Sequence, residues 1–119
     1  MEKKDLKERT KQFALKVIKI VEMLPKGRTA DILGRQFMSA GTSVGANYRA
    51  ACRARSTAEF ISKMGIVEEE ADETIYWMEL LIDSGLIGKN DLIHLLSEAD
   101  QILAITVSSI KTARKSKNE

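Results

Sequence analysis

Residues 39–56 read SAGTSVGANYRAACRARS, and this stretch decides what kind of fold the chain adopts. It has no proline and no strand-like alternation, whereas Val44, Tyr48 and Ala51 recur at steps of three and four. Such steps place side chains on one face of an α-helix. The stretch is therefore predicted to lie within a long helix.

Three glycines, Gly34, Gly41 and Gly45, fall inside this predicted helix. Each costs about 1 kcal/mol relative to alanine in a helix interior, so we expect a compensating contact. Small residues three and four apart let another helix approach closely, and Ser43 and Asn47 on that side need hydrogen-bond partners once buried. A phosphate-binding loop is the alternative, but GTSVGAN lacks the lysine and Ser/Thr that follow the glycines of a Walker motif. The pattern favours close helix packing.

Breaks in the pattern divide the chain into four segments. LPKGRT at 24–29 and DSGLIGKND at 83–91 contain glycine or proline, which interrupt helices. Long segments with apolar residues at helical spacing and short connections favour antiparallel neighbours. The predicted fold is all-α, one domain over 1–119, an up-down-up-down four-helix bundle. The predicted helices are 5–24, 30–54, 57–84 and 91–113.

Helix starts are also marked by residue type. Ser56 with Glu59 three residues later is a capping-box signature. Thr29 and Asn90 are predicted N-caps of two further helices, because short polar side chains accept hydrogen bonds from the first backbone N–H groups.

Composition sets the broad class of protein. The chain has 119 residues, of which 44% are hydrophobic and 30% charged, and a single proline, which is typical of a soluble helical domain. Cys52 is the lone cysteine and fits a reducing compartment. The charged start MEKKDLKERTKQ has no signal-peptide core, and no apolar run is long enough to span a membrane. We therefore predict a cytoplasmic protein with no membrane partner.

Charge is segregated along the chain. Residues 1–55 hold 13 Lys and Arg against 5 Asp and Glu, whereas residues 56–110 hold 2 against 11. The overall charge of +2 is mild for a dedicated polyanion binder. A basic half and an acidic half suit self-association, because the positive face of one subunit can meet the negative face of the next. The residues predicted for this self-contact and for close helix packing are Gly41, Ser43, Gly45, Asn47, Arg49, Arg53, Arg55, Glu69, Asp72, Glu73 and Trp77.

The acidic run EEEADE at 68–73 has three interpretations. It is a solvated helix face, or it meets the arginines of a neighbouring subunit, or, least favoured, it binds a metal. In the predicted hairpin Arg49 and Glu69 lie about 12 Å apart along the axis, at about 1.5 Å per residue. They are therefore poor partners within one chain.

Lysines and arginines of the first helix and the tail are candidates for contact with RNA or DNA. Several copies in an assembly would multiply a weak phosphate attraction. The alternatives are that these cations only keep the helix ends soluble, and that the protein is an interaction module without nucleic acid. The candidate residues are Lys4, Lys7, Lys11, Lys16, Lys19, Lys111, Arg114, Lys115 and Lys117.

Catalytic signals are weak. A di-iron bundle needs Glu-x-x-His motifs, and His94, the only histidine, has no glutamate three residues before it. Cys52 has no obvious base beside it, so an inert packing role is favoured. We predict neither an enzyme nor a cofactor, and no small-molecule substrate is indicated; a small metal-binding bundle is the disfavoured alternative.

The run SVGANYRAACRARSTAEFISKM at 43–64, with DSGLI at 83–87, resembles the 23S rRNA intervening-sequence proteins. The chain departs from that family's pattern at Ala50 and Ala51, where Glu-Gly is usual, and at Glu69 and Glu70, where Gly-Ser is usual. The resemblance implies a helical bundle that forms a homopentamer and associates with RNA; a related branch resembles the nucleic-acid-binding accessory proteins of diversity-generating retroelements. The matching positions are Ser43, Val44, Ala46, Asn47, Arg55, Ser56, Glu59 and Phe60.

Overall fold

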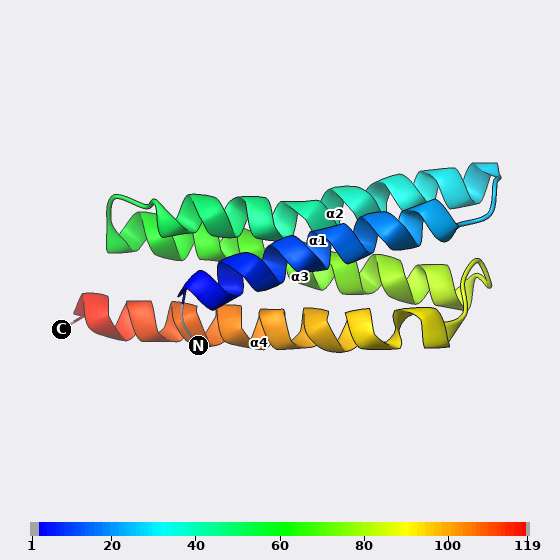
Figure 1. The fold of residues 1–119 in the computed structure, drawn as a ribbon. Helices are drawn as coiled ribbons and strands as arrows, with labels where there is room; N and C mark the ends of the chain where they lie inside the picture. The colour runs from blue at the N-terminus through cyan, green and yellow to red at the C-terminus, as the bar shows by residue number, and fades with distance from the viewer. Residues whose placement is uncertain (1–2, 119) are drawn as a thin grey trace.

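The computed structural model describes residues 3–118, and it is all-α (Figure 1). Its extents are 52 × 21 × 21 Å, so the helices lie along one long axis. The predicted all-α four-helix fold is confirmed. Within the described residues, no helix is both long and apolar enough to cross a membrane. The helices are α1 (Lys3–Met23), α2 (Arg28–Cys52), α3 (Thr57–Asp83) and α4 (Lys89–Asn118).

The start of α3 follows the predicted cap. Ser56 has an extended backbone, and its hydroxyl oxygen accepts a hydrogen bond from the N–H of Glu59 at 3.1 Å. The Glu59 carboxylate accepts from the N–H of Arg55 at 3.4 Å. These two contacts bind backbone N–H groups that have no partner within the helix.

The predicted caps Thr29 and Asn90 are wrong, because both residues lie inside their helices: α2 and α4 begin at 28 and 89, two residues before the predicted starts at 30 and 91. A glycine precedes each helix, and its carbonyl accepts a backbone hydrogen bond of the first turn: Gly27 from the N–H of Asp31 at 3.0 Å, and Gly88 from the N–H of Asp91 at 3.1 Å. Gly27 has a φ of 154°, which favours glycine. The end of α4 also differs from the prediction, because the helix continues to 118 rather than 113.

The core runs along the whole bundle and draws on all four helices. Buried threonines are accommodated in it because their hydroxyls donate to carbonyls of their own helices: Thr10 to Lys7, and Thr106 to Ile102. Few aromatic rings are present, so aliphatic side chains and methionine fill most of the volume. The largest fully buried side chains include Phe13, Phe37, Met64, Met78, Leu81, Leu92 and Ile102.

α1 packs directly on the glycines of α2. A methyl group added at Gly41 would lie 2.7 Å from Cγ2 of Val17. A methyl group added at Gly34 would lie 3.1 Å from Cδ1 of Leu24, and one added at Gly45 would lie 3.2 Å from Oγ1 of Thr10. The compensating contact expected for these glycines therefore lies within the chain. Closer approach of the two helices offsets the cost of glycine through dispersion contacts along the interface.

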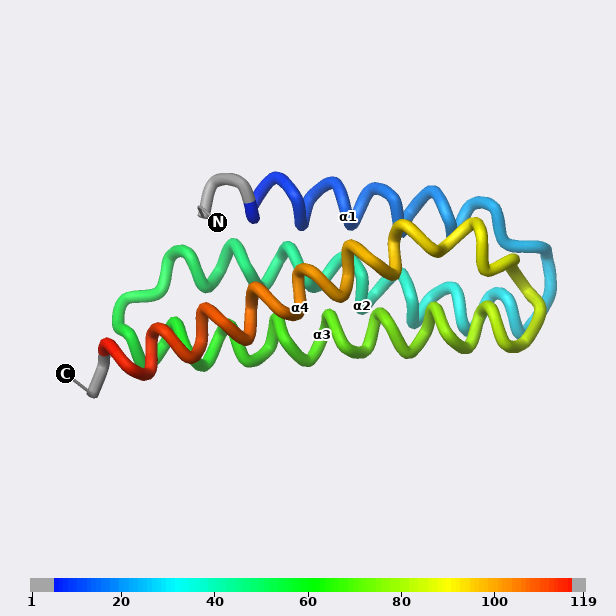
Figure 2. The backbone as a smooth tube through the Cα atoms, turned by 90° about the horizontal axis from the view of Figure 1, so that it is seen from below, coloured from blue at the N-terminus to red at the C-terminus, as the bar shows by residue number. Residues whose placement is uncertain are grey.

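The four helices do not pack equally well. α1 contacts α2, α2 contacts α3 and α3 contacts α4, while the contact between α1 and α4 is the smallest. The two views show α1 and α4 crossing at an angle: α4 leaves α1 toward the beginning of α1 in Figure 2 but lies near it there in Figure 1. In both views the last turns of α4 extend beyond the start of α1, which leaves one end of the bundle open.

Candidate nucleic-acid interface

Cations from separate segments gather at the open end of the bundle. The connection between α2 and α3 lies at the same end as the last turns of α4 (Figure 1). Arg55 of the connection lines the same groove as Thr112 and Ser116 of α4. We call the exposed cations of these two segments the basic end. They are Arg53, Arg55, Lys111, Arg114 and Lys115.

This grouping differs from the one expected from sequence. Arg53 and Arg55 were predicted for self-contact, whereas Lys111, Arg114 and Lys115 were predicted for nucleic acid. The fold places all five at one end because α4 is long enough to reach the α2–α3 connection.

The lysines of α1 share their helix with acidic residues, so the positive charge of this surface is lower. Lys7, Lys11 and Lys19 are exposed, but Glu8 and Glu22 are exposed on the same helix. The exposed Lys16 contributes to lowering the pKa of Glu98 of α4, so part of its charge is already balanced. The basic end therefore has a denser positive charge than the face of α1.

The side chains of Lys4 and Lys117 lie outside the described part of the chain.

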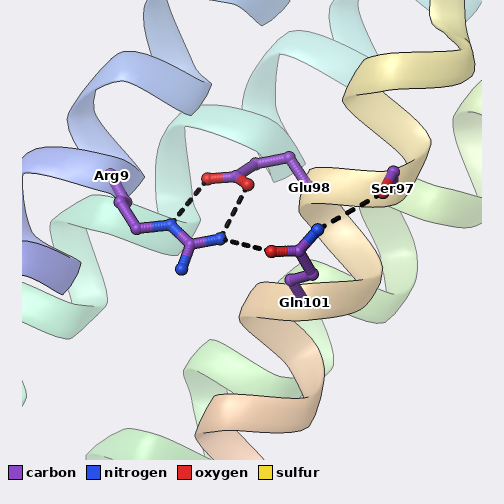
Figure 3. Close-up of polar contacts among 4 residues, drawn as sticks. All are labelled: Arg9, Ser97, Glu98 and Gln101. Atoms are coloured by element: carbon purple, nitrogen blue, oxygen red, sulfur yellow. Dashed lines mark hydrogen bonds and ion pairs between the residues drawn. The ribbon is translucent and has the colours of Figure 1, made fainter. Parts of the chain in front are cut away.

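An ion-pair cluster joins α1 to α4 near the start of α1 (Figure 3). Arg9 Nε donates to Glu98 Oε2 at 2.9 Å, and Arg9 Nη2 donates to Glu98 Oε1 at 2.7 Å. The same Nη2 donates to Gln101 Oε1 at 3.0 Å, and Gln101 Nε2 donates to Ser97 Oγ at 3.4 Å. A bidentate arginine–carboxylate pair is the strongest geometry for such a contact. Sequence reasoning missed this cluster, because Arg9 and Glu98 lie 89 residues apart in the chain.

The Arg9–Glu98 pair makes stability depend on pH. The hydrogen bond from Arg9 lowers the pKa of Glu98, against the opposing effect of burial, and the charges of Arg9 and Lys16 lower it further. Because the folded pKa is lowered, the stabilisation is fully present above the unfolded pKa and is lost as pH falls through the folded value.

We expect Glu98→Gln to lower the free energy of unfolding by roughly 1 kcal/mol near neutral pH, since the pair is only partly buried. The difference from the unsubstituted protein should shrink toward zero as the pH falls through the lowered pKa of Glu98, because the protonated carboxyl is neutral like the glutamine amide. Urea unfolding at neutral pH and at a series of acidic pH values measures it. Asp31→Asn, which breaks the exposed Arg35–Asp31 pair within α2, is the control and should cost at most about 0.5 kcal/mol. A Glu98→Gln difference that is constant with pH would contradict the assignment.

A groove of about 890 Å³ lies beside the basic end. We call it the end groove. Its apolar lining includes Leu6, Phe60 and Ile105, and Arg55 is its charged lining residue. Hydroxyl side chains of α4 form another part of its lining. These are Ser108, Ser109, Thr112 and Ser116.

Tyr48 and Cys52 lie together on the lining of the end groove. Burial, followed by its hydrogen bond with Cys52, raises the pKa of the Tyr48 hydroxyl. Tyr48 therefore stays neutral at physiological pH and packs in the core, while Cys52 is a free, half-buried thiol.

The polar residues beside the glycines of α2 are satisfied on their own helix. Ser43 Oγ donates to the carbonyl of Ser39 at 2.6 Å, and Asn47 Nδ2 donates to the carbonyl of Ser43 at 2.8 Å. Both side chains are half-buried. They need no second subunit to pair these groups.

The charged residues predicted for self-contact lie on the surface. Arg49, Glu69, Asp72 and Glu73 are exposed, and no ion pair joins them to one another among the described side chains. Burial, followed by the charges of Glu73 and Glu69, raises the pKa of the half-buried Glu70 beside them. Repulsion between these carboxylates therefore remains uncompensated within the single chain.

Trp77, also predicted for self-contact, packs against the core and makes an edge-to-face contact with exposed Tyr76 at 5.2 Å between ring centroids. Its Nε1 is buried and has no acceptor among the described residues.

His94 is exposed near the start of α4. Among the described residues, no three side chains of His, Cys, Asp or Glu come together in a metal-binding arrangement.

The structure is an all-α four-helix protein in which α1 packs closely on the glycines of α2. This is the fold that the resemblance of residues 43–64 implied. The chain belongs to the 23S rRNA-intervening sequence protein family, whose sequence profile matches residues 2–108. A crystal structure from Bacteroides thetaiotaomicron, described as a protein with unknown function from the S23 ribosomal protein family, is similar with a TM-score of 0.86. It is 32% identical, and the match covers 93% of this chain and 99% of that one. Comparison with curated proteins finds no match.

Proposed function

We propose that the protein is a non-enzymatic scaffold, an up-down-up-down bundle that assembles as a homopentamer and binds RNA or DNA at the basic end. The observation that carries this proposal is the gathering of five exposed cations from two distant segments at one end of the bundle.

Assembly would strengthen this binding. One basic end neutralises only a few phosphates, so its affinity for nucleic acid is low at physiological salt. Copies arranged alike present several basic ends to one strand, so that the second contact becomes effectively intramolecular. The exposed acidic face of α3 is a surface on which a neighbouring subunit's arginines would bind.

The proposal predicts a mass near five times 13.3 kDa in sedimentation equilibrium. It also predicts binding to labelled RNA and DNA at about 50 mM salt that weakens linearly in log–log plots as salt rises. Arg114→Gln with Lys115→Gln should weaken binding by about tenfold at that salt concentration.

The matched control removes two cations from the opposite end, Lys26→Gln with Lys89→Gln, and should leave affinity within about twofold. A monomer in sedimentation would contradict the assembly. Absence of nucleic-acid binding at low salt would contradict the basic-end function and leave the protein-interaction module.

A further inference from the structure

We infer that the end groove receives an unpaired base, so that the basic end binds single-stranded nucleic acid in preference to duplex. This inference rests on the proposed nucleic-acid function and specifies its substrate class.

The groove has the size of a ligand site and walls that are held in place. Its volume of about 890 Å³ falls within the range of about 300–1,000 Å³ typical of small-molecule sites. The Arg9–Glu98 pair joins α1 to α4 near the start of α1, and the core fixes α2 and α3. The groove is therefore bounded by packed helices and by the short α2–α3 connection that carries Arg55.

The lining matches the two surfaces of a nucleobase. Leu6, Phe60 and Ile105 offer apolar contact to a flat ring. The hydroxyls of Ser108 and Thr112 both donate and accept hydrogen bonds, so they suit the edges of any base. Such a lining predicts little discrimination between bases.

The charges around the groove match a phosphate backbone. Arg55 is the charged residue of the lining, and no carboxylate side chain lines the groove among the described residues. A guanidinium group binds phosphate in a bidentate manner and also stacks on bases. The other cations of the basic end extend this positive surface along α4.

A duplex uses only part of this surface. Its bases are stacked and paired inside the helix, so its phosphates meet the basic end while the groove stays unfilled. Single strands expose unstacked bases, which proteins bind through aromatic or apolar contacts and edge hydrogen bonds. An acidic partner helix would meet the same cations, but its apolar side chains match the hydroxyl-rich wall of α4 poorly.

The test fills the groove without removing charge. Ser108→Leu places an apolar side chain in the groove at an exposed helical position, where leucine is a better helix former than serine. Anisotropy is measured with a labelled single-stranded RNA of mixed sequence and with a hairpin duplex of the same length, at about 50 mM salt.

We expect the unsubstituted protein to bind the single strand at least about fivefold more tightly than the duplex, since one stacked base contributes about that much. Ser108→Leu should remove this preference and leave duplex affinity unchanged. Ser62→Leu, at an exposed serine of α3 outside the groove, should change neither.

The outcomes separate this inference from the function on which it rests. Equal, salt-dependent binding of both probes that Ser108→Leu does not alter would overturn the inference and leave nucleic-acid binding intact. Absence of binding of either probe would overturn both. Binding of an acidic helical peptide that is sensitive to Ser108→Leu, while RNA binding is not, would assign the groove to a protein partner and overturn the inference.

Discussion

Replacing Gly41 with leucine is expected to lower the free energy of unfolding by about 3 kcal/mol, although leucine is a far better helix former than glycine. The first added carbon would lie 2.7 and 2.8 Å from the two methyl groups of Val17. Val17 is fully buried and β-branched, so it has no alternative rotamer into which it can retreat. α1 must move away from α2, and contacts along the whole interface weaken. Urea unfolding followed by circular dichroism measures the loss.

The chain offers a matched control in α3. A carbon added at Gly65 meets no atom within 4 Å, so Gly65→Leu should raise the free energy of unfolding by up to about 1 kcal/mol through helix propensity alone. Val17→Ala combined with Gly41→Leu should recover part of the loss, because the two sites share one contact. A Gly41→Leu protein as stable as the Gly65→Leu protein would show that α1 does not pack closely on Gly41.

The helices were predictable from sequence where the signals were local. The breaks at 24–29 and 83–91 and the Ser56 cap depend on a few neighbouring residues, and all correspond to the structure. The starts of α2 and α4 were missed because the residue before each helix is a glycine, Gly27 or Gly88, which has no side chain that could mark a cap. The need for a close neighbour at Gly41 was evident from its cost, but its identity depends on which residues of α1 and α2 face each other.

The candidate site was predictable as residue types but not as a place. Lysines and arginines were recognised along the chain, whereas their gathering depends on the length of α4 and its direction relative to α2. The Arg9–Glu98 pair left only a weak signal, an arginine beside buried Thr10 and a glutamate beside buried Ala99. The end groove left none, since its lining comes from all four helices and the α2–α3 connection, which only the packed bundle brings together.

Reversing the charge of Arg49 in α2 is expected to disrupt the proposed assembly. Arg49→Glu places a carboxylate opposite the acidic face of α3 in a neighbouring subunit. Arg49 is exposed and makes no ion pair among the described side chains. Breaking desolvated charge pairs costs about 3–5 kcal/mol, so the association constant per contact should fall by a factor of about 100 or more. Sedimentation velocity at micromolar concentration should then show the monomer.

The reciprocal reversal makes this prediction specific. Glu69→Arg with Glu73→Arg should also yield a monomer, although it relieves the repulsion that raises the pKa of Glu70. Joining the three substitutions Arg49→Glu, Glu69→Arg and Glu73→Arg in one chain restores opposite charges at the contact and should restore the assembly. Loss of assembly through misfolding would not be rescued in this way, and Lys89→Glu at the opposite end should have no effect. A three-substitution protein that stays monomeric while folding normally would show that Arg49 and the α3 carboxylates do not meet between subunits.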